Sequence, residues 1–247
     1  RYTESLAALP RKNGKSTLAA GIILYCLTCD GRTGGQYYTA AQTAQQSGLI
    51  YRMAARMVRQ SPLLAKRLKP IDSTTRIVYQ SRGSFIKSIP SDAGPVHGTK
   101  PAVVVFDELH TQKSRDLYDA LKTGQGATPN PLFISITTAG HDRHSICWDI
   151  WNNTARAIRD GLNDNPYFLP CIYELKEGAD WKDESTWAAC NPNLGVSIDW
   201  DFLRGEATKA KESPRYENTF RNLYLNEWTE QAVRWLSMDK WRLCGGE

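Results

Sequence analysis

The sequence predicts an α/β fold, in which a mainly parallel β-sheet flanked by helices is joined to a smaller, mostly helical subdomain. The first indication is a short apolar run that leads through a glycine-containing loop into a long apolar helix. The second is Ala102 to Phe106, an unalternating apolar run typical of strands buried on both faces. The third is that all eight tryptophans lie from Trp148 onward, among short helical patterns. We therefore predict a sheet domain over residues 1–142 and a helical subdomain over 143–247.

Periodicity and turn residues predict the elements in order. A short buried strand at 6–10 runs into the loop, and the helix that follows spans about 16–29, where the turn Asp30 to Gly35 closes it. A hairpin is expected around Ser81 to Gly83, and Ser91 to Lys100 is rich in loop-forming residues. The other strands are expected at 36–40, 76–79, 84–89, 102–106 and 132–136, with a second helix at 43–60. Strands that alternate with helices are typical of a parallel sheet.

Composition and charge exclude few classes of protein. The chain of 247 residues is 41% hydrophobic and 23% charged, which is ordinary for a globular protein. Its net charge of +5 suits a polyanionic partner, but a solvated surface explains it equally well. No apolar run approaches the roughly 18 residues that cross a bilayer, so we expect no membrane association and a cytoplasmic location. Because the chain begins at Arg1, we expect an upstream segment to be missing.

The six cysteines are expected to be reduced. Cys26 and Cys29 have the spacing of a zinc-binding pair, and His141 and His144 form a distant second pair. Both cysteines fall inside an apolar helical run, however, and the sequence has no second Cys-x-x-Cys. Structural zinc is therefore not expected.

Residues Leu9 to Thr17 match a phosphate-binding loop in part. The pattern is glycine, four free positions and Gly-Lys-Ser/Thr; Gly14, Lys15 and Ser16 supply its end, whereas Leu9 occupies the place of the first glycine. Gly14 lets the backbone approach a phosphate, Lys15 can reach β- and γ-phosphates, and the Ser16 hydroxyl can hold Mg²⁺. The tripeptide alone also occurs by chance. The predicted nucleotide-binding residues are Arg11, Lys12, Asn13, Gly14, Lys15, Ser16 and Thr17.

Two carboxylates, Asp107 and Glu108, end the predicted strand at 102–106. Open α/β sheets bind ligands at the carboxyl ends of their strands. Asp107 is suited to placing Mg²⁺, as the Walker B aspartate does, and Glu108 is suited to orienting or deprotonating water for in-line attack on a γ-phosphate. A plain acidic strand end or helix cap is the alternative interpretation.

Thr137 and Thr138 end the next predicted strand. If the strands lie in one parallel sheet, Lys15, Asp107 and Thr137 meet along one rim. The threonines are then expected to sense the γ-phosphate and to couple it to the following subdomain, with a simple β-turn as the alternative. Together these groups predict a P-loop NTPase of the ASCE, RecA-like type, with ATP and Mg²⁺ as cofactors.

These motifs resemble the large terminase subunit of tailed bacteriophages. The resemblance covers nearly the whole chain and rests on Pro10 to Thr17 as a deviant Walker A motif, Val103 to His110 as Walker B plus catalytic glutamate, and Ser135 to Gly140 as the coupling motif. Weaker matches are Asn191 to Gly195 and Leu225 to Trp228. The resemblance implies an ATPase that drives double-stranded DNA into a procapsid.

The same resemblance implies roles and partners. Arg11 is expected to read the γ-phosphate and to act in catalysis with Lys15 and Glu108. Residues 1–142 would be the P-loop ATPase core, and 143–247 a lid or linker that leads to a nuclease domain not recognisable in this chain. The implied partners are double-stranded DNA, the portal protein and the small terminase subunit. The implied assembly is a homo-oligomeric ring docked on the portal in the host cytoplasm, and a monomer is allowed in isolation.

Two features depart from the family pattern. The adenine-stacking segment expected before the first strand is absent, so the sequence does not identify the adenine-binding residues. Related motors have an Arg-Gly pair as a finger that acts on a neighbouring subunit, whereas this chain has His97-Gly98 there, and histidine lacks the permanent bidentate charge of arginine. Lys100, Arg82 or an arginine of the second subdomain are the alternatives.

Two other functions fit parts of the sequence. Asp107 to His110 also matches the Asp-Glu-x-His motif of superfamily 2 helicases, although no second RecA-like domain is recognised in the sequence. Leu9, which replaces the first loop glycine, leaves open a nucleotide-binding switch that hydrolyses nothing.

Overall fold

The structure is a computed structural model that describes residues 1–91 and 98–229. The chain folds into two compact units. Unit 1 comprises Arg1–Ala7, Lys15–Thr137 and Ser145–Cys171, and unit 2 comprises Ala8–Gly14, Thr138–His144 and the chain from Ile172 onward. The chain therefore changes unit inside the predicted phosphate loop and again between the two predicted coupling threonines. The division at 142/143 stays a prediction.

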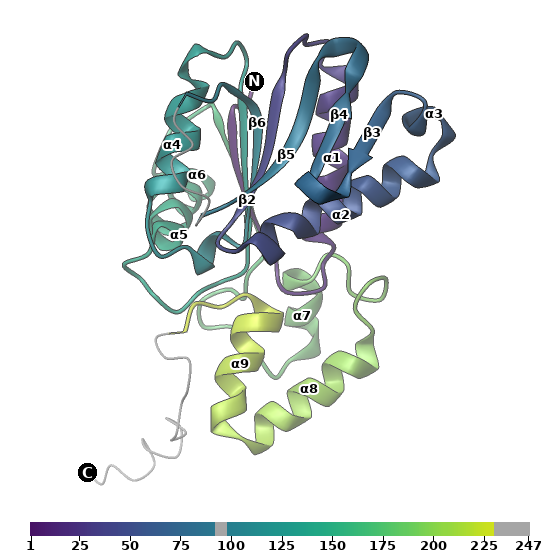
Figure 1. Ribbon diagram of the computed structural model, residues 1–247. Coiled ribbons are helices and arrows are strands. Elements are labelled where there is room, and N and C mark those ends of the chain that lie inside the picture. Colours follow the sequence, from purple (N-terminus) through teal and green to yellow (C-terminus); the bar gives the residue numbers. More distant parts are fainter. Residues whose placement is uncertain (92–97, 230–247) are drawn as a thin grey trace, which may run out of the picture. The chain divides into compact units, whose positions relative to one another are not determined.

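An eight-stranded sheet runs in the order β3-β4-β5-β2-β6-β7-β1-β8 (Figure 1). Its strands are β1 (Glu4–Ala8), β2 (Gln36–Ala41), β3 (Leu68–Ile71), β4 (Arg76–Tyr79), β5 (Ser84–Pro90), β6 (Pro101–Asp107), β7 (Leu132–Thr137) and β8 (Phe168–Ile172). The pairs β2/β5, β2/β6 and β6/β7 are parallel, and β3/β4 and β4/β5 are antiparallel. The predicted mainly parallel α/β sheet is confirmed.

The described residues contain the two helices predicted for the sheet domain and others that the sequence analysis did not predict. The α-helices are α1 (Lys15–Cys29), α2 (Ala44–Gln60), α3 (Pro62–Ala65), α4 (Asp116–Gly124), α5 (Ile146–Trp148), α6 (Ala157–Arg159), α7 (Glu184–Cys190), α8 (Trp200–Glu212) and α9 (Pro214–Leu225), and a π-helical segment, Asp149–Arg156, joins α5 to α6. The predicted helices at 16–29 and 43–60 are confirmed as α1 and α2. Thr43 caps α2 because its Oγ1 accepts from the Gln46 N–H while the Gln46 side chain returns to the Thr43 N–H.

Both edge strands of the sheet are absent from the sequence prediction. β3 contains Pro70 and β8 contains Pro170. Proline cannot donate to the strand ladder, so it occurs at sheet edges and weakens the strand pattern there. The predicted hairpin is confirmed as β4 and β5, joined by a turn in which Gly83 has the left-handed φ of +62°.

The central strand β6 is buried along all seven of its residues. Figure 1 shows α1 and α2 on one side of the sheet and α4 to α6 on the other. Val103 and Val105 join the core cluster beneath α1 and α2, whereas Phe106 faces the opposite way and stacks on Phe133 with ring centroids 6.3 Å apart. Asp107 continues the alternation of Val103 and Val105, which directs it toward the side of α1.

Unit 2 has a separate hydrophobic core between α7, α8 and α9. Trp181 and Trp187 both pack on Phe220, with ring centroids 5.7 and 5.9 Å away, and the Trp187 indole N–H donates to the Trp181 carbonyl at 2.8 Å. These tryptophans are core residues, as expected. Trp151 is a buried residue of unit 1, and the tryptophans beyond 229 lie outside the described residues.

Candidate active site

The sheet brings the ends of two predicted strands to one edge. β6 and β7 are parallel neighbours, and their register pairs Asp107 with Ile136, so Thr137 lies just beyond the end of β6. Lys15 is the first residue of α1, and its charge is close enough to lower the pKa of the Asp107 carboxyl. The structure therefore gathers Lys15, Asp107, Glu108 and Thr137 in unit 1.

The Asp107 carboxylate is 1% exposed, and neither of its oxygens has a hydrogen-bond partner. The pKa of Asp107 is raised to about 7, mainly by burial and in second place by the neighbouring Glu108 charge. The Glu108 backbone N–H and the Lys15 ammonium act in the opposite direction, although that N–H does not reach hydrogen-bonding geometry. A buried carboxylate without donors is costly, so this side chain needs a cation or a proton.

This environment fits Mg²⁺. The ion prefers oxygen ligands and is usually held by one or two protein groups together with phosphate oxygens and water. Asp107 supplies an unsatisfied carboxylate, and Ser16, in the first turn of α1, supplies a hydroxyl. Within residues 1–91 and 98–229, no three or more His, Cys, Asp and Glu side chains form a metal-binding group.

Glu108 has an unusual backbone conformation. Its φ of +49° and ψ of +52° lie in the left-handed region, where residues other than glycine are rare. It lies between β6 and the 3₁₀ turn Leu109–Thr111, whose Thr111 N–H and Oγ1 donate to the Glu108 carbonyl at 2.9 and 2.8 Å. Strain of this kind clusters at functional sites. The turn separates the half-buried Glu108 carboxylate from the buried Asp107 carboxylate.

His110 is a site residue for which the sequence analysis predicted no role. Its Nδ1 lies 3.2 Å from Glu108 Oε2 and 3.1 Å from Thr137 Oγ1. Its backbone N–H also donates to Thr137 Oγ1 at 3.1 Å. The role of Thr137 in sensing the γ-phosphate stays a prediction; its hydroxyl contacts His110 and lies 3.7 Å from Cys147 Sγ. The only sequence signal was the position of His110 two residues after Glu108.

The first half of the phosphate loop is held within unit 2 by an asparagine turn. The buried Asn13 amide donates to Asn191 Oδ1 at 2.8 Å, and Asn13 Oδ1 accepts from the Asn193 N–H at 3.2 Å. Asn193 Nδ2 donates to the Asn13 carbonyl at 3.1 Å. Asn191 Nδ2 in turn donates to the Tyr224 carbonyl of α9 at 2.8 Å. Asn191 and Asn193 were noted only as a weak family match, and the sequence did not indicate that they support this loop.

The other loop residues are placed as follows. Gly14 has a φ of +77°, and a Cβ there would lie 3.3 Å from Asn193 Nδ2, so both backbone and space favour glycine. The exposed Arg11 is anchored by its N–H to the Leu223 carbonyl at 2.9 Å. Lys12 Nζ lies 4.0 Å from the centre of the Phe202 ring. In unit 1, the Thr17 hydroxyl points to Met53 Sδ, 3.7 Å away.

The predicted coupling pair is divided between the units. Thr137 ends a segment of unit 1, and Thr138 begins the 138–144 segment of unit 2. In that segment the Ala139 N–H donates to Asn226 Oδ1 at 2.7 Å, and Asn226 is the left-handed cap of α9, with a φ of +57°. The end of α9 therefore holds the segment that contains Ala139, directly after the predicted coupling threonines.

The residues that could act as a finger on a neighbouring subunit lie in different parts of the chain. His97 lies outside the described residues. The Lys100 N–H donates to Gln36 Oε1 at 3.0 Å, next to the start of β6. Arg82 Nη1 donates to the Thr28 carbonyl at 3.3 Å. Because Thr28 is in the last turn of α1, Arg82 lies roughly 20 Å along the helix from Lys15 of its own chain.

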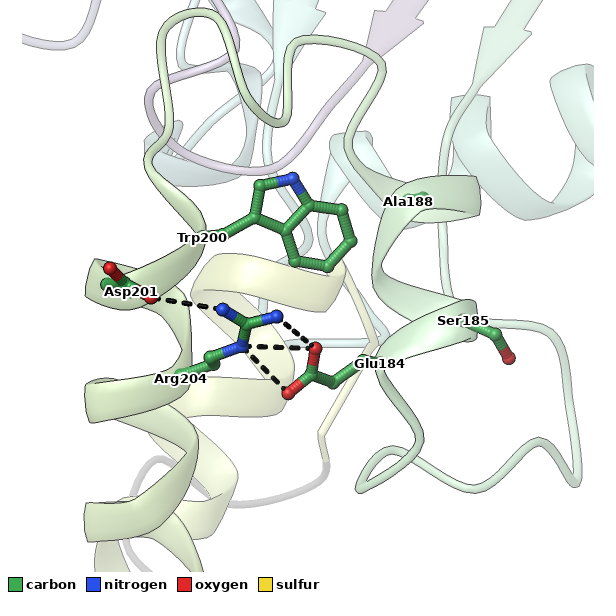
Figure 2. Close-up of a pocket in the computed structure, with 6 residues that line it drawn as sticks. All are labelled: Glu184, Ser185, Ala188, Trp200, Asp201 and Arg204. Atoms are coloured by element: carbon green, nitrogen blue, oxygen red, sulfur yellow. Dashed lines mark hydrogen bonds and ion pairs between the residues drawn. The ribbon is translucent and has the colours of Figure 1, made fainter.

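A shallow pocket in unit 2 contains none of the predicted site residues (Figure 2). Arg204 lies between two carboxylates there: its Nη2 is 2.9 Å from Glu184 Oε2, and its Nη1 is 3.0 Å from Asp201 Oδ1. Its guanidinium also lies 5.6 Å from the Trp200 ring centre. The Arg204 guanidinium is therefore paired with carboxylates of the same pocket.

The thiols and the helix lengths are two further features of the described residues. The described cysteines, among them Cys26 and Cys29, are free thiols. Burial raises the pKa of Cys26 to about 11, which disfavours the thiolate that zinc would need. None of the helices within 1–91 and 98–229 combines the length and apolar character needed to cross a bilayer.

The sheet order, the loop before α1 and the acidic end of β6 define a P-loop NTPase domain. A family model described as "Terminase large subunit, ATPase domain" matches residues 1–156. This chain belongs to the family of terminase large subunit ATPase domains.

Individual relatives agree with this assignment. The terminase large subunit of Enterobacteria phage HK97 is 30% identical over 245 residues, which cover 98% of this chain and 47% of the phage protein. The HK97 large terminase structure has a TM-score of 0.83 at 27% identity and covers 99% of this chain and 50% of that one. The large terminase of a thermophilic bacteriophage in complex with ADP shares the fold, with a TM-score of 0.59, 10% identity and coverage of 92% and 49%. The chain spans about half the length of these relatives.

Proposed function

We propose that this chain hydrolyses ATP with Mg²⁺ and thereby drives double-stranded DNA into a procapsid. The observation that carries the proposal is the buried Asp107 carboxylate, which lacks hydrogen-bond donors, lies within the electrostatic reach of Lys15 and is followed directly by Glu108. A carboxylate that needs a cation, beside a lysine at a helix N-terminus, is the arrangement that binds Mg²⁺ and nucleotide phosphates. The ATPase family to which the chain belongs supports the same ligand.

The loop residues are proposed to bind the phosphates. Lys15, at the start of α1, contacts the β- and γ-phosphates, and the loop backbone from Arg11 to Gly14 surrounds them. The Arg11 guanidinium reads the γ-phosphate, because its permanent charge and forked donors match phosphate oxygens. Asp107 and the Ser16 hydroxyl hold Mg²⁺. When bound, the ion supplies charge neutralisation at the β- and γ-phosphate oxygens.

Glu108 is proposed to orient the attacking water and to accept its proton. The carboxylate is half-buried and lies one residue beyond Asp107, on a backbone turned into the left-handed region. A carboxylate one residue beyond the proposed metal aspartate is suited to meet the nucleophile of an in-line attack. Thr137 and Thr138 couple hydrolysis to unit 2, since the chain changes unit between them.

Glu108→Gln tests this function. The variant keeps the size of the side chain and removes the basic carboxylate, so kcat for Mg²⁺-dependent ATP hydrolysis should fall by about 10²- to 10⁴-fold. The affinity for ATP, measured by calorimetric titration, should stay within about twofold, because Glu108 is not proposed to bind the phosphates. Glu177→Gln, in an exposed loop, is the matched control and should hydrolyse at the parental rate.

The outcomes separate the alternatives. Hydrolysis by Glu108→Gln at the parental rate means that Glu108 is misassigned. ATP binding without hydrolysis by the parental protein favours a nucleotide switch. Strand separation without capsids favours a helicase. In the full-length subunit, the same variant should stop packaging of double-stranded DNA in the presence of procapsids with portal and the small terminase subunit.

A further inference from the structure

The inference concerns the contact between His110, Glu108 and Thr137. All three belong to unit 1, so their geometry is internal to one compact body. The His110 Nδ1 atom lies 3.2 Å from Glu108 Oε2 and 3.1 Å from Thr137 Oγ1. One ring nitrogen therefore touches both the proposed catalytic carboxylate and the proposed coupling hydroxyl.

The chemistry of the partners determines which atom carries the proton. An ionised carboxylate can only accept hydrogen bonds, so a lone pair on His110 Nδ1 would be repelled by Glu108 Oε2. Thr137 Oγ1 already accepts the His110 backbone N–H at 3.1 Å. The tautomer with hydrogen on Nδ1 satisfies the carboxylate and keeps Thr137 Oγ1 as a second acceptor.

This contact fixes one of the two Glu108 oxygens. Oε2 lies against the imidazole, and we assign Oε1 to the attacking water. A carboxylate whose rotamer is held by a neighbouring donor loses less freedom in the transition state. The buried Leu109 and the Thr111 bonds to the Glu108 carbonyl anchor the same turn.

Thr137 connects this turn to the rest of the chain. It is the last residue of β7 and the last residue of unit 1 before the chain enters unit 2 at Thr138. Because His110 contacts Thr137 through both its backbone and its ring, a shift at the end of β7 is passed to the carboxylate that His110 holds.

We propose that His110 is a positioning residue that holds Glu108 for water activation and links it to Thr137. The inference rests on the proposed ATP hydrolysis by Glu108, and it adds a residue that touches neither nucleotide nor metal. His110 acts through its Nδ1 atom. The proposal can therefore be tested with substitutions whose side-chain nitrogen lies at a different distance from the backbone.

The test compares substitutions at His110 in the Mg²⁺-dependent ATPase assay. The Asn amide nitrogen is as many bonds from Cα as Nδ1, whereas the Gln amide nitrogen is one bond further away. His110→Ala should lower kcat roughly 10- to 100-fold, as loss of a supporting hydrogen bond does elsewhere, with KM for ATP within about twofold. His110→Asn should recover to within about threefold of the parent, and His110→Gln should not. His144→Ala, at an exposed histidine, is the control.

A double-variant cycle tests the link to Thr137. Thr137→Val keeps the side-chain shape and removes the hydroxyl that accepts the His110 N–H. If both residues act on Glu108 as one unit, kcat of His110→Ala/Thr137→Val should equal that of the worse single variant instead of the product of two losses.

The outcomes are distinct. Absence of hydrolysis by the parental protein contradicts the proposed function itself. Parental hydrolysis together with full activity of His110→Ala overturns the inference alone. Equal kcat values for His110→Asn and His110→Gln would show that the position of the nitrogen does not matter, and would also overturn the inference. This comparison remains possible if His110→Ala does not fold. Independent losses in the double variant overturn the link to Thr137.

Discussion

At the scale of single residues, Asp107 shows how a site can oppose stability. Its side chain is buried at the end of β6 without a hydrogen bond to either oxygen, and burial raises its pKa to about 7. An ordinary aspartate in the unfolded chain has a pKa near 4. Between these two values the folded protein keeps a proton that the unfolded chain has lost. Stability is therefore lost as the pH rises through this window.

Asp107→Asn should make the metal-free protein more stable at neutral and alkaline pH. The pKa of Asp107 differs by about 3 units between the folded and the unfolded chain, so ionisation lowers the free energy of unfolding by at most roughly 4 kcal/mol. A neutral amide does not ionise and avoids this loss. Urea unfolding in the presence of a chelator should give the variant a higher free energy of unfolding than the parent near pH 8. Near pH 4 the two free energies should be similar, because the folded protein then has a neutral side chain at position 107 in both cases. A variant that is less stable than the parent near pH 8, or a difference that does not change with pH, would contradict this account. The variant should also lack Mg²⁺-dependent hydrolysis.

At the scale of elements, the phosphate loop is supported from both sides of Gly14. Residues before Gly14 are bonded to the Asn191–Asn193 turn and to α9, and residues after it form α1. The loop keeps a left-handed Lys12 and a left-handed Gly14, at φ of +64° and +77°. A positive φ is unfavourable for lysine but not for glycine. The hydrogen bonds around the loop therefore have to stabilise the strained backbone of Lys12.

Asn193→Ala should loosen the loop without unfolding unit 2. The side chain is half-buried and its Nδ2 donates one bond, to the Asn13 carbonyl at 3.1 Å. Loss of such a bond costs about 0.5–1.5 kcal/mol, so the affinity for ATP should fall roughly two- to tenfold while the melting temperature changes little. Calorimetric titration measures the first quantity and thermal unfolding the second. Asn163→Ala, in an exposed turn, is the matched control; equal ATP affinity in both variants would show that Asn193 does not support the loop.

At the scale of the whole molecule, the segments proposed to act in catalysis are divided between units with separate hydrophobic cores. The sheet core lies between α1, α2 and the central strands, and the second core gathers around Phe220. The unit built on Phe220 also includes 8–14 and 138–144, the segments on either side of the proposed coupling path. Stability of these two segments should therefore follow the helical unit.

Phe220→Ala should lower protection against hydrogen exchange in α7 to α9 and also in 8–14 and 138–144. Removal of a fully buried phenylalanine costs about 3–5 kcal/mol, and local opening falls mainly on the unit that contains it. Phe133→Ala, an equally buried residue of unit 1, is the matched comparison and should lower protection in β6 and β7 instead. If 8–14 exchanges like the sheet in both variants, the division of the loop between the units is wrong.

Much of the fold was predictable because it depends on local patterns. The apolar run at 102–106 predicts β6, and the capping residue Thr43 marks the start of α2. Strands β3 and β8 were missed because proline obscures the pattern at sheet edges. The residues at the strand ends were also predictable, since polar groups that directly follow buried strands are few.

The sequence by itself determined the α/β class, the family resemblance and the positions of Lys15, Asp107, Glu108 and Thr137 at the ends of predicted elements. Only the tertiary structure decided what these side chains touch. His110 meets a threonine 27 positions away, and Asn13 meets Asn191 across 178 positions. The physical reason is that hydrophobic periodicity records which face of an element is buried. The partner of a buried polar group depends instead on which distant segments the fold brings within hydrogen-bonding distance.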